Sequence, residues 1–197
     1  MEEENYKAAG WAAIASALLF VLAFGLLLYD DLGKYPTLNL PGSPVNILPM
    51  VILLDAISKV LLIYAWLRFR TLLNQPYQFH AIDTLIVVLL VGGVLLGAVS
   101  YLGRGLPELK VPVAVTGAIM AVTLGIIGIV TATRLLRLNG DLGGMLKPLA
   151  YTFMAASICF ALVILTPVGL VLEVAVAILL GVTLLRGHEE PEQIEIV

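Results

Sequence analysis

The sequence has few charged residues: Asp, Glu, Lys and Arg make up 13% of its 197 residues. About a quarter of the residues in a soluble globular domain are charged, so this chain has too few to cover a water-facing surface. The two histidines lie away from the centres of the apolar runs, which argues against haem held between helices. The single cysteine, Cys159, excludes an intrachain disulfide and a thiolate metal cage.

Catalytic and nucleic-acid signatures are also absent. The chain has no P-loop, no His-Glu-x-x-His, no Gly-x-Ser-x-Gly and no Cys-x-x-Cys. No block of Lys and Arg resembles a phosphate-binding footprint. We therefore expect no enzyme activity, no nucleic-acid partner, no metal and no cofactor, with an intramembrane enzyme as a weak third hypothesis.

Long apolar runs are what the sequence does contain, and 60% of its residues are hydrophobic. Six runs meet or approach the roughly 20 residues that span a bilayer: residues 8–29, 45–68, 80–103, 111–135, 148–165 and 168–186. The last two are joined only by Thr166-Pro167, which favours a tight helical hairpin over one broken re-entrant element. The sequence predicts an all-α, polytopic membrane protein: a six-helix bundle forming a single membrane domain over residues 1–197.

The distribution of Lys and Arg predicts the orientation of this bundle. Seven lie on one side of the six predicted spans and three on the other, while Lys59 lies within the second span. The seven are Lys7, Arg68, Arg70, Arg134, Arg137, Lys147 and Arg186. Because cytoplasmic loops are enriched in Lys and Arg, both termini are expected in the cytoplasm, including the acidic tail 187–197.

The connections between the predicted spans contain no inserted domain. Residues 30–44 form the longest one, rich in proline and expected outside, where it is either a plain connector or a lid. Residues 74–78 and 139–144 form short inner connections, so the helices that they join should be antiparallel neighbours.

Small residues recur at spacings of three and four, which places them on one face of a helix. Such faces let helices approach closely in lipid, within a bundle or between subunits of a homo-oligomer. The residues predicted to pack helices are Gly93, Gly97, Gly117, Ala121, Gly125, Gly128, Gly169, Ala177 and Gly181.

The charged residues inside the apolar runs are the strongest functional signal. Asp55 and Lys59 lie near the midpoint of the second run, four residues apart on one helical face, with Ser58 beside them. Glu173 lies in the small-residue stripe of the sixth run. A charge at the centre of a membrane helix costs about 2.5–3.5 kcal/mol on insertion scales. Either Asp55 and Lys59 are a structural ion pair, or they line a polar centre with Glu173 and Ser58.

Asp83, Arg68 and Arg70 lie at the predicted inner ends of the second and third runs. They are a candidate cytoplasmic gate, although a local pair that stabilises the start of the third helix explains Asp83 more simply. Aromatic residues near the ends of the runs, Tyr101 among them, are expected to be interfacial anchors.

We expect from these residues a small multi-pass protein of the plasma (inner) membrane. The leading hypothesis is a transporter or channel for a small solute or ion. One form of this hypothesis couples transport to protons through the carboxylates within the membrane. The alternative is a non-catalytic accessory or assembly subunit that packs through its small-residue faces against a larger membrane complex. The lipid bilayer is the one partner that both hypotheses share.

Overall fold

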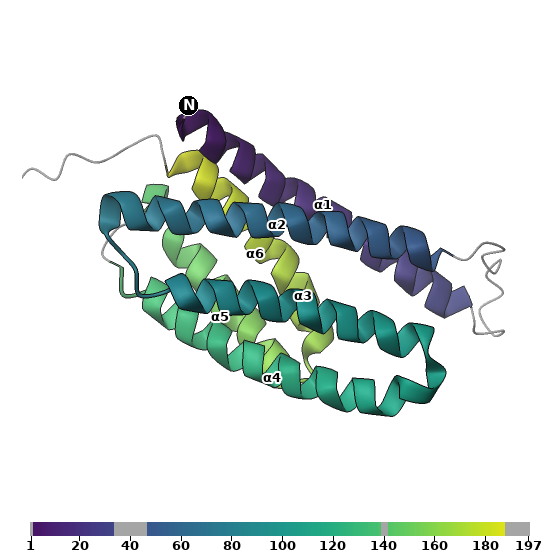
Figure 1. Cartoon of the computed structure of the whole chain (residues 1–197). Coiled ribbons are helices and arrows are strands. Elements are labelled where there is room, and N and C mark those ends of the chain that lie inside the picture. Colours follow the sequence, from purple (N-terminus) through teal and green to yellow (C-terminus); the bar gives the residue numbers. More distant parts are fainter. Residues whose placement is uncertain (1, 34–46, 139–141, 188–197) are drawn as a thin grey trace, which may run out of the picture.

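The computed structural model describes residues 2–33, 47–138 and 142–187, and the regular structure within them is entirely helical (Figure 1). The long helices are α1 (Glu2–Gly33), α2 (Leu48–Tyr77), α3 (Asp83–Gly105), α4 (Lys110–Leu135), α5 (Leu146–Ala161) and α6 (Thr166–Arg186). Two short 3-10 helices, η2 (Pro107–Leu109) and η3 (Leu142–Gly144), lie in connections. The predicted all-helical class is confirmed for this part of the chain.

Five of the described helices, α1, α2, α3, α4 and α6, are long and apolar enough to cross a membrane. With a rise of 1.5 Å per residue, α1 and α2 are about 48 and 45 Å long, more than the ~30 Å hydrocarbon core of a bilayer. By the same measure α5, with 16 residues, is only about 24 Å long. The chain is thus a helical membrane protein in which α5 is shorter than the span predicted over residues 148–165.

The helices α1 and α2 extend beyond the predicted runs 8–29 and 45–68. Apolar composition marks the part of a helix that matches the bilayer, whereas the helix itself continues until its backbone geometry changes. In α2 that change occurs at Gln78, which has left-handed backbone angles and donates its N–H to the carbonyl of Leu73. The inner connection therefore begins at Gln78 and not at Asn74.

The long connection predicted over residues 30–44 also begins later. Asp30 and Asp31 belong to the last turn of α1, which ends at Gly33. The rest of that connection, residues 34–44, lies outside the described residues, as do residues 139–141 of the predicted turn 139–144 and the acidic tail from residue 188.

The six described helices form a ring in chain order. Helix α1 packs between α2 and α6, and α4 packs between α3 and α5, so that the α5–α6 hairpin joins the two groups. Helices α2 and α3 touch much less than the other consecutive pairs, although a short turn connects them. The ring is therefore closed loosely along the seam between α2 and α3 (Figure 1).

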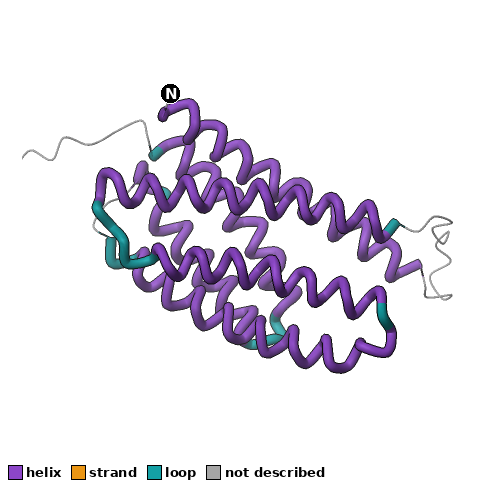
Figure 2. The backbone as a smooth tube through the Cα atoms, in the orientation of Figure 1, coloured by secondary structure: helices purple, strands orange, loops and turns teal. Residues whose placement is uncertain are grey.

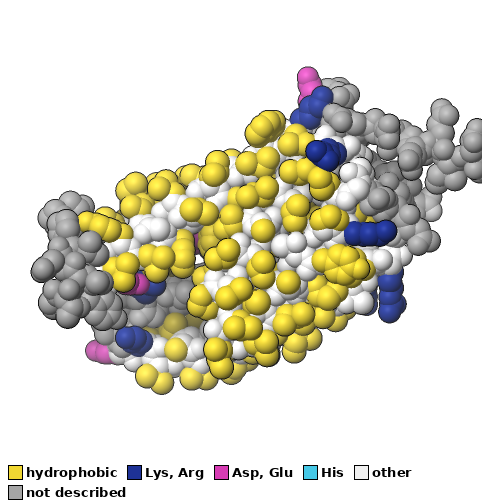
Figure 3. Space-filling view, turned by 180° about the vertical axis from the view of Figure 1, so that it is seen from behind, with side chains coloured by type: hydrophobic (Ala, Val, Ile, Leu, Met, Phe, Trp, Pro, Cys, Tyr) yellow, Lys and Arg dark blue, Asp and Glu magenta, His cyan; other side chains and the backbone are white. Residues whose placement is uncertain are grey.

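One end of the ring carries most of the positive charge. The N-terminus of α1, the α2–α3 turn and the C-terminus of α6 lie at this end, which we call the basic end (Figure 1). The seven Lys and Arg residues grouped above by sequence lie in or toward these segments and the α4–α5 connection. Figure 3 shows several Lys and Arg side chains gathered there.

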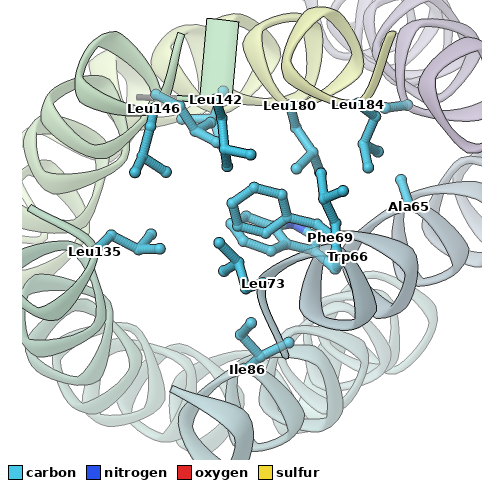
Figure 4. Close-up of a cluster of buried hydrophobic side chains, with 14 of the residues drawn as sticks. Ala65, Trp66, Phe69, Leu73, Ile86, Leu135, Leu142, Leu146, Leu180 and Leu184 are labelled. Atoms are coloured by element: carbon cyan, nitrogen blue, oxygen red, sulfur yellow. The ribbon is translucent and has the colours of Figure 1, made fainter. Parts of the chain in front are cut away.

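The apolar core fills the basic end of the ring. Its largest enclosed side chains come from the second half of α2, the first turn of α3, the end of α4, the start of α5 and the second half of α6. Figure 4 shows side chains of this core pointing into the interior of the ring. They include Phe69, Leu73, Ile86, Leu135, Leu142, Leu146, Leu180 and Leu184. The described half of the ring away from the basic end lacks a comparable cluster.

The α5–α6 turn explains part of this asymmetry. It consists of residues 162–165, while Thr166 and Pro167, predicted to be the turn, begin α6 instead, as the fixed φ of proline at a helix start favours. Figure 2 shows that this turn lies short of the end reached by α1, α2, α3 and α4. The hairpin therefore leaves the ring incomplete at that end.

The chemistry of this turn suits an apolar environment. Its four residues, Leu162 to Leu165, have no charge. The N–H groups of Leu162, Val163 and Ile164 donate to carbonyl groups of the turn or of the end of α5. Backbone groups inside a bilayer must be satisfied in this way, since lipid offers no hydrogen bonds.

Small residues bring two helix pairs into close contact, as predicted. A Cβ added at Gly125 of α4 would lie 2.6 Å from the backbone nitrogen of Ala161 in α5. One added at Gly181 of α6 would lie 2.7 Å from the carbonyl oxygen of Gly10 in α1. The backbones of these pairs could not approach so closely with larger residues.

The remaining small residues fall into two groups. Gly128 and Gly169 contact α5, and Ala121 and Ala177 are buried. A Cβ at Gly117 would only reach ordinary contact with Leu96, and one at Gly93 would meet nothing within 4 Å. Gly97 faces a side chain of α2, described below. The stripe of α3 therefore does not form the tight helix contact that its spacing predicts.

Gly181→Ala should destabilise the bundle by about 1–3 kcal/mol, because the added methyl group meets the Gly10 backbone, which cannot move aside alone. Gly93→Ala is the matched control and should leave stability unchanged or raise it by up to about 1 kcal/mol, since alanine favours helix. Unfolding in mixed micelles, followed by circular dichroism during titration with dodecyl sulfate, measures both. Equal stability of the two variants would contradict close α1–α6 packing.

Candidate functional site

Asp55 and Lys59 of α2 form an ion pair one helical turn apart. The Asp55 side chain is 9% exposed and that of Lys59 30%. The pair is therefore tucked into the ring, yet the ammonium group remains accessible to a small molecule. This contact is the self-neutralising ion pair that the spacing of the two residues allows. The residues around the pair determine whether it also takes part in binding.

Helix α3 contacts the side chain of Lys59 through Gly97 and Tyr101. A Cβ added at Gly97 would lie 2.8 Å from the Nζ atom of Lys59, so the lysine side chain rests where residue 97 has no side chain. The same Nζ lies 6.0 Å from the centre of the Tyr101 ring, within range of a cation–π interaction. Tyr101 also interacts with Asp55. Two residues of α3, four apart, thus complete the surroundings of the pair.

Glu173 of α6 lies in the electrostatic field of the pair. Its carboxylate interacts with Lys59, which attracts it, and with Asp55, which repels it. Glu173 is half-buried as a residue. Among the described residues no hydrogen bond or ion pair holds it. The structure therefore brings Glu173 to the same region as Asp55 and Lys59 without tying it to either.

We call Asp55, Lys59, Tyr101 and Glu173 the polar centre. With Asp55, Lys59 and Glu173 ionised, its net charge is −1. A small pocket of about 60 Å³ adjoins it, lined by Asp55 and Tyr101 together with Phe20 and other residues of α1. This arrangement can hold a small cation or proton beside one unpaired carboxylate.

The position of the polar centre along the helices differs from the prediction. Asp55 is the eighth residue of α2 counted from Leu48, and Glu173 is the eighth of α6 counted from Thr166. Because α2 continues to Tyr77, Asp55 lies in the half of that helix away from the basic end and not at its midpoint. The apolar core then lies between the polar centre and the basic end.

Ser58 does not face the polar centre as its neighbours do. Its hydroxyl group donates to the backbone oxygen of Ser16 in α1 at 2.9 Å, and the two hydroxyl oxygens are 3.4 Å apart. Both serines are buried. Ser58 therefore fastens α2 to α1, as serines commonly do between membrane helices.

The candidate cytoplasmic gate is a local network at the α2–α3 turn. Arg70 donates through Nε to Asp83 at 2.8 Å, and Asn74 donates to both carboxylate oxygens of Asp83 at 3.0 Å. His80 lies 3.1 Å from the same carboxylate. Arg68 is not part of it, since its guanidinium lies over the Tyr64 ring, 5.5 Å from its centre. The network fixes the first turn of α3 to the end of α2.

Sequence reasoning missed two members of this site. Tyr101 was expected to be an interfacial anchor and Gly97 a packing residue, yet both contact the ion pair. Their spacing of four residues on α3 matches the spacing of Asp55 and Lys59 on α2. The equal spacing is visible in the sequence. Only the packing of α3 beside α2, however, shows that Gly97 and Tyr101 lie next to the ion pair.

The described residues contain no group of three or more His, Cys, Asp or Glu side chains that could hold a metal ion. Comparison with protein-family models, curated proteins and solved structures gave no match. The chemistry of the polar centre is therefore argued from its own residues.

A water-filled polar centre predicts different reactivity at two positions on one face of α6. In a Cys159→Ala background, Glu173→Cys should react with a water-soluble methanethiosulfonate reagent. Leu180→Cys, two turns along α6 inside the apolar core, should react at least about tenfold more slowly, because its side chain is fully buried. Mass spectrometry of the labelled protein in vesicles measures both rates. Equal rates would mean that the region around Glu173 is no wetter than the core.

Proposed function

We propose that the protein is a small membrane transporter or channel for a small solute or ion, with Asp55, Lys59 and Glu173 at its binding centre. The observation that carries this proposal is a half-buried glutamate, Glu173, within electrostatic range of an ion pair that already neutralises itself. Ionisable groups at membrane depth are expensive, and they commonly mark the pathway of an ion or a proton.

The charge balance indicates what this centre binds. Asp55 and Lys59 cancel, so Glu173 leaves one negative charge in a region of low dielectric constant. A proton or a monovalent cation removes that charge, and its departure restores it. Alternate occupancy by a proton and by another cation is the simplest way in which such a centre couples their movement.

The apolar core supports the same proposal by acting as a barrier. It lies between the polar centre and the basic end and includes Phe69, Leu73 and Leu180, all fully buried. Apolar constrictions block ions because ions do not shed their water there. The polar centre is therefore accessible from the other end, and passage requires the helices around the core to move.

We further propose that the basic end faces the cytoplasm of a cell with a plasma membrane of the bacterial or archaeal type. The seven Lys and Arg residues in or toward that end support this orientation through the positive-inside rule. A protease-sensitive tag added after Val197 should then be cut in inverted membrane vesicles and protected in intact cells. Cutting in intact cells would reverse the orientation.

The alternative of an accessory subunit is supported by α3. Ile86 is its buried residue, and the outward face of this helix is apolar and exposed. A partner helix or a second copy of the chain could cover that face. Stoichiometric co-purification with larger membrane proteins after mild solubilisation would favour this alternative, whereas the protein alone or as a homo-oligomer would favour transport.

The transport proposal predicts the effect of neutralising the polar centre. In proteoliposomes under a pH gradient, Asp55→Asn and Glu173→Gln should each lower proton flux by about tenfold or more, because a binding group for the cation is lost. Glu108→Gln, an exposed acid in η2, is the control and should keep wild-type flux. Flux is measured with a pH-sensitive dye trapped inside the vesicles. Indistinguishable flux in all four proteins, or none in any, would count against transport.

A further inference from the structure

An apolar groove lies along the seam between α2 and α3, on the side of the polar centre that faces the basic end. The groove has a volume of about 340 Å³ and is lined only by apolar side chains, among them Ile63 and Leu67 of α2 and Val87, Leu90 and Val94 of α3. From Val87 to Val94 it follows about 10 Å of helix. It lies where α2 and α3 barely touch, so it opens sideways from the bundle.

The groove and the polar centre share one line of residues. On α2, Asp55, Lys59, Ile63 and Leu67 follow one another at intervals of four, which places them along one row that winds slowly around the helix. The first two belong to the polar centre and the last two line the groove. The Lys59 ammonium group, resting against Gly97, lies at the junction.

We propose, building on the transport function above, that the substrate is an amphiphilic organic cation: an ammonium headgroup with a single hydrocarbon tail, entering from the membrane along this seam. The tail occupies the groove between α2 and α3. The headgroup lies at the polar centre, where its positive charge balances the charge that Asp55 and Lys59 leave on Glu173.

Three observations favour this substrate over an inorganic ion. The pocket beside Asp55 is lined by the aromatic rings of Phe20, Phe24 and Tyr101. A carboxylate among aromatic faces suits an alkylated ammonium group. The described residues offer no group of three or more His, Cys, Asp or Glu side chains for a metal. The groove has no polar lining, so it suits a hydrocarbon tail. An inorganic ion has no such tail and would leave the groove unused.

The groove also needs an occupant of this kind. An empty apolar space loses the dispersion contacts of its walls, and water gains nothing by entering it. Because the groove opens toward the lipid, a hydrocarbon chain fills it. A chain whose headgroup carries one positive charge gains in addition the interaction with Glu173, and that difference selects the cation over uncharged lipid.

Lys59 controls the junction between tail and headgroup sites. It occupies the space above Gly97, between the polar centre and the groove residues of α2 and α3. An incoming ammonium group competes with Lys59 for Asp55, and Lys59 then turns toward Glu173, which already attracts it. The total charge of the centre with its substrate stays at zero throughout this exchange.

Binding of octyltrimethylammonium to the protein in lipid nanodiscs tests the inference, because this probe has a permanent charge and one short tail. Saturable binding of radiolabelled probe is expected. Tetramethylammonium, which lacks the tail, and octanol, which lacks the charge, should each compete at least about tenfold more weakly. Competition by zwitterionic lysophosphatidylcholine as strong as that by the probe itself would overturn the assignment to a cation.

Variants of the two halves of the site sharpen the test. Val94→Phe or Val91→Phe fills the groove and should weaken probe binding by about tenfold. Val88→Phe is the control, since Val88 is 40% and Val94 42% exposed but Val88 does not line the groove. Glu173→Gln should weaken probe binding to a similar degree. Equal binding by Val94→Phe, Val91→Phe and Val88→Phe, or wild-type binding by Glu173→Gln, would overturn the proposal.

The proposed transport function is tested separately from this substrate class. Proton flux that depends on Asp55, without saturable binding of octyltrimethylammonium, would leave the transport proposal standing and overturn the amphiphile. Saturable binding of octyltrimethylammonium without any proton flux would leave the amphiphile-binding site standing and overturn the transport proposal.

Discussion

The ion pair between Asp55 and Lys59 constrains the whole arrangement of α2. A helix that carries two charges within its apolar span cannot turn that face to lipid without a cost of about 2.5–3.5 kcal/mol for each charge. The face must therefore point into the ring, and this fixes the rotation of the whole of α2 about its axis. Ser58, on an adjoining face, then meets Ser16 of α1, while the line through Ile63 and Leu67 meets α3.

The ring is packed unevenly, and the reason lies in the length of its helices. Close contacts at Gly125 and Gly181 hold α5 against α4 and α6 against α1. Because the hairpin of α5 and α6 turns before the end of the bundle, it completes the ring only toward the basic end. Apolar side chains fill that half, and the polar centre, to which α6 contributes Glu173, lies between this core and the turn.

Much of this architecture could be predicted from the sequence, because apolar length and Lys/Arg distribution are properties of single segments. The helices and the α5–α6 hairpin match the predicted pattern, and Glu173 lies within electrostatic range of Asp55 and Lys59. Helix ends could not be predicted as well, since α2 continues through Arg70 and Asn74, where composition indicates a loop. The roles of Gly97 and Tyr101 depend on how α2 and α3 pair, and that pairing is set by contacts between helices that no single segment encodes.

The loose α2–α3 seam is better understood as a property of the site than as poor packing. Gly93 faces open space and Gly97 faces a lysine, so these two glycines of α3 do not draw α2 close. A seam closed by larger side chains would bury Lys59 completely and would make its ion pair permanent. With glycine at position 97, the ammonium group rests on backbone and can leave it without disturbing a packed side chain. One charge can then move between two carboxylates while the helices around it stay in place.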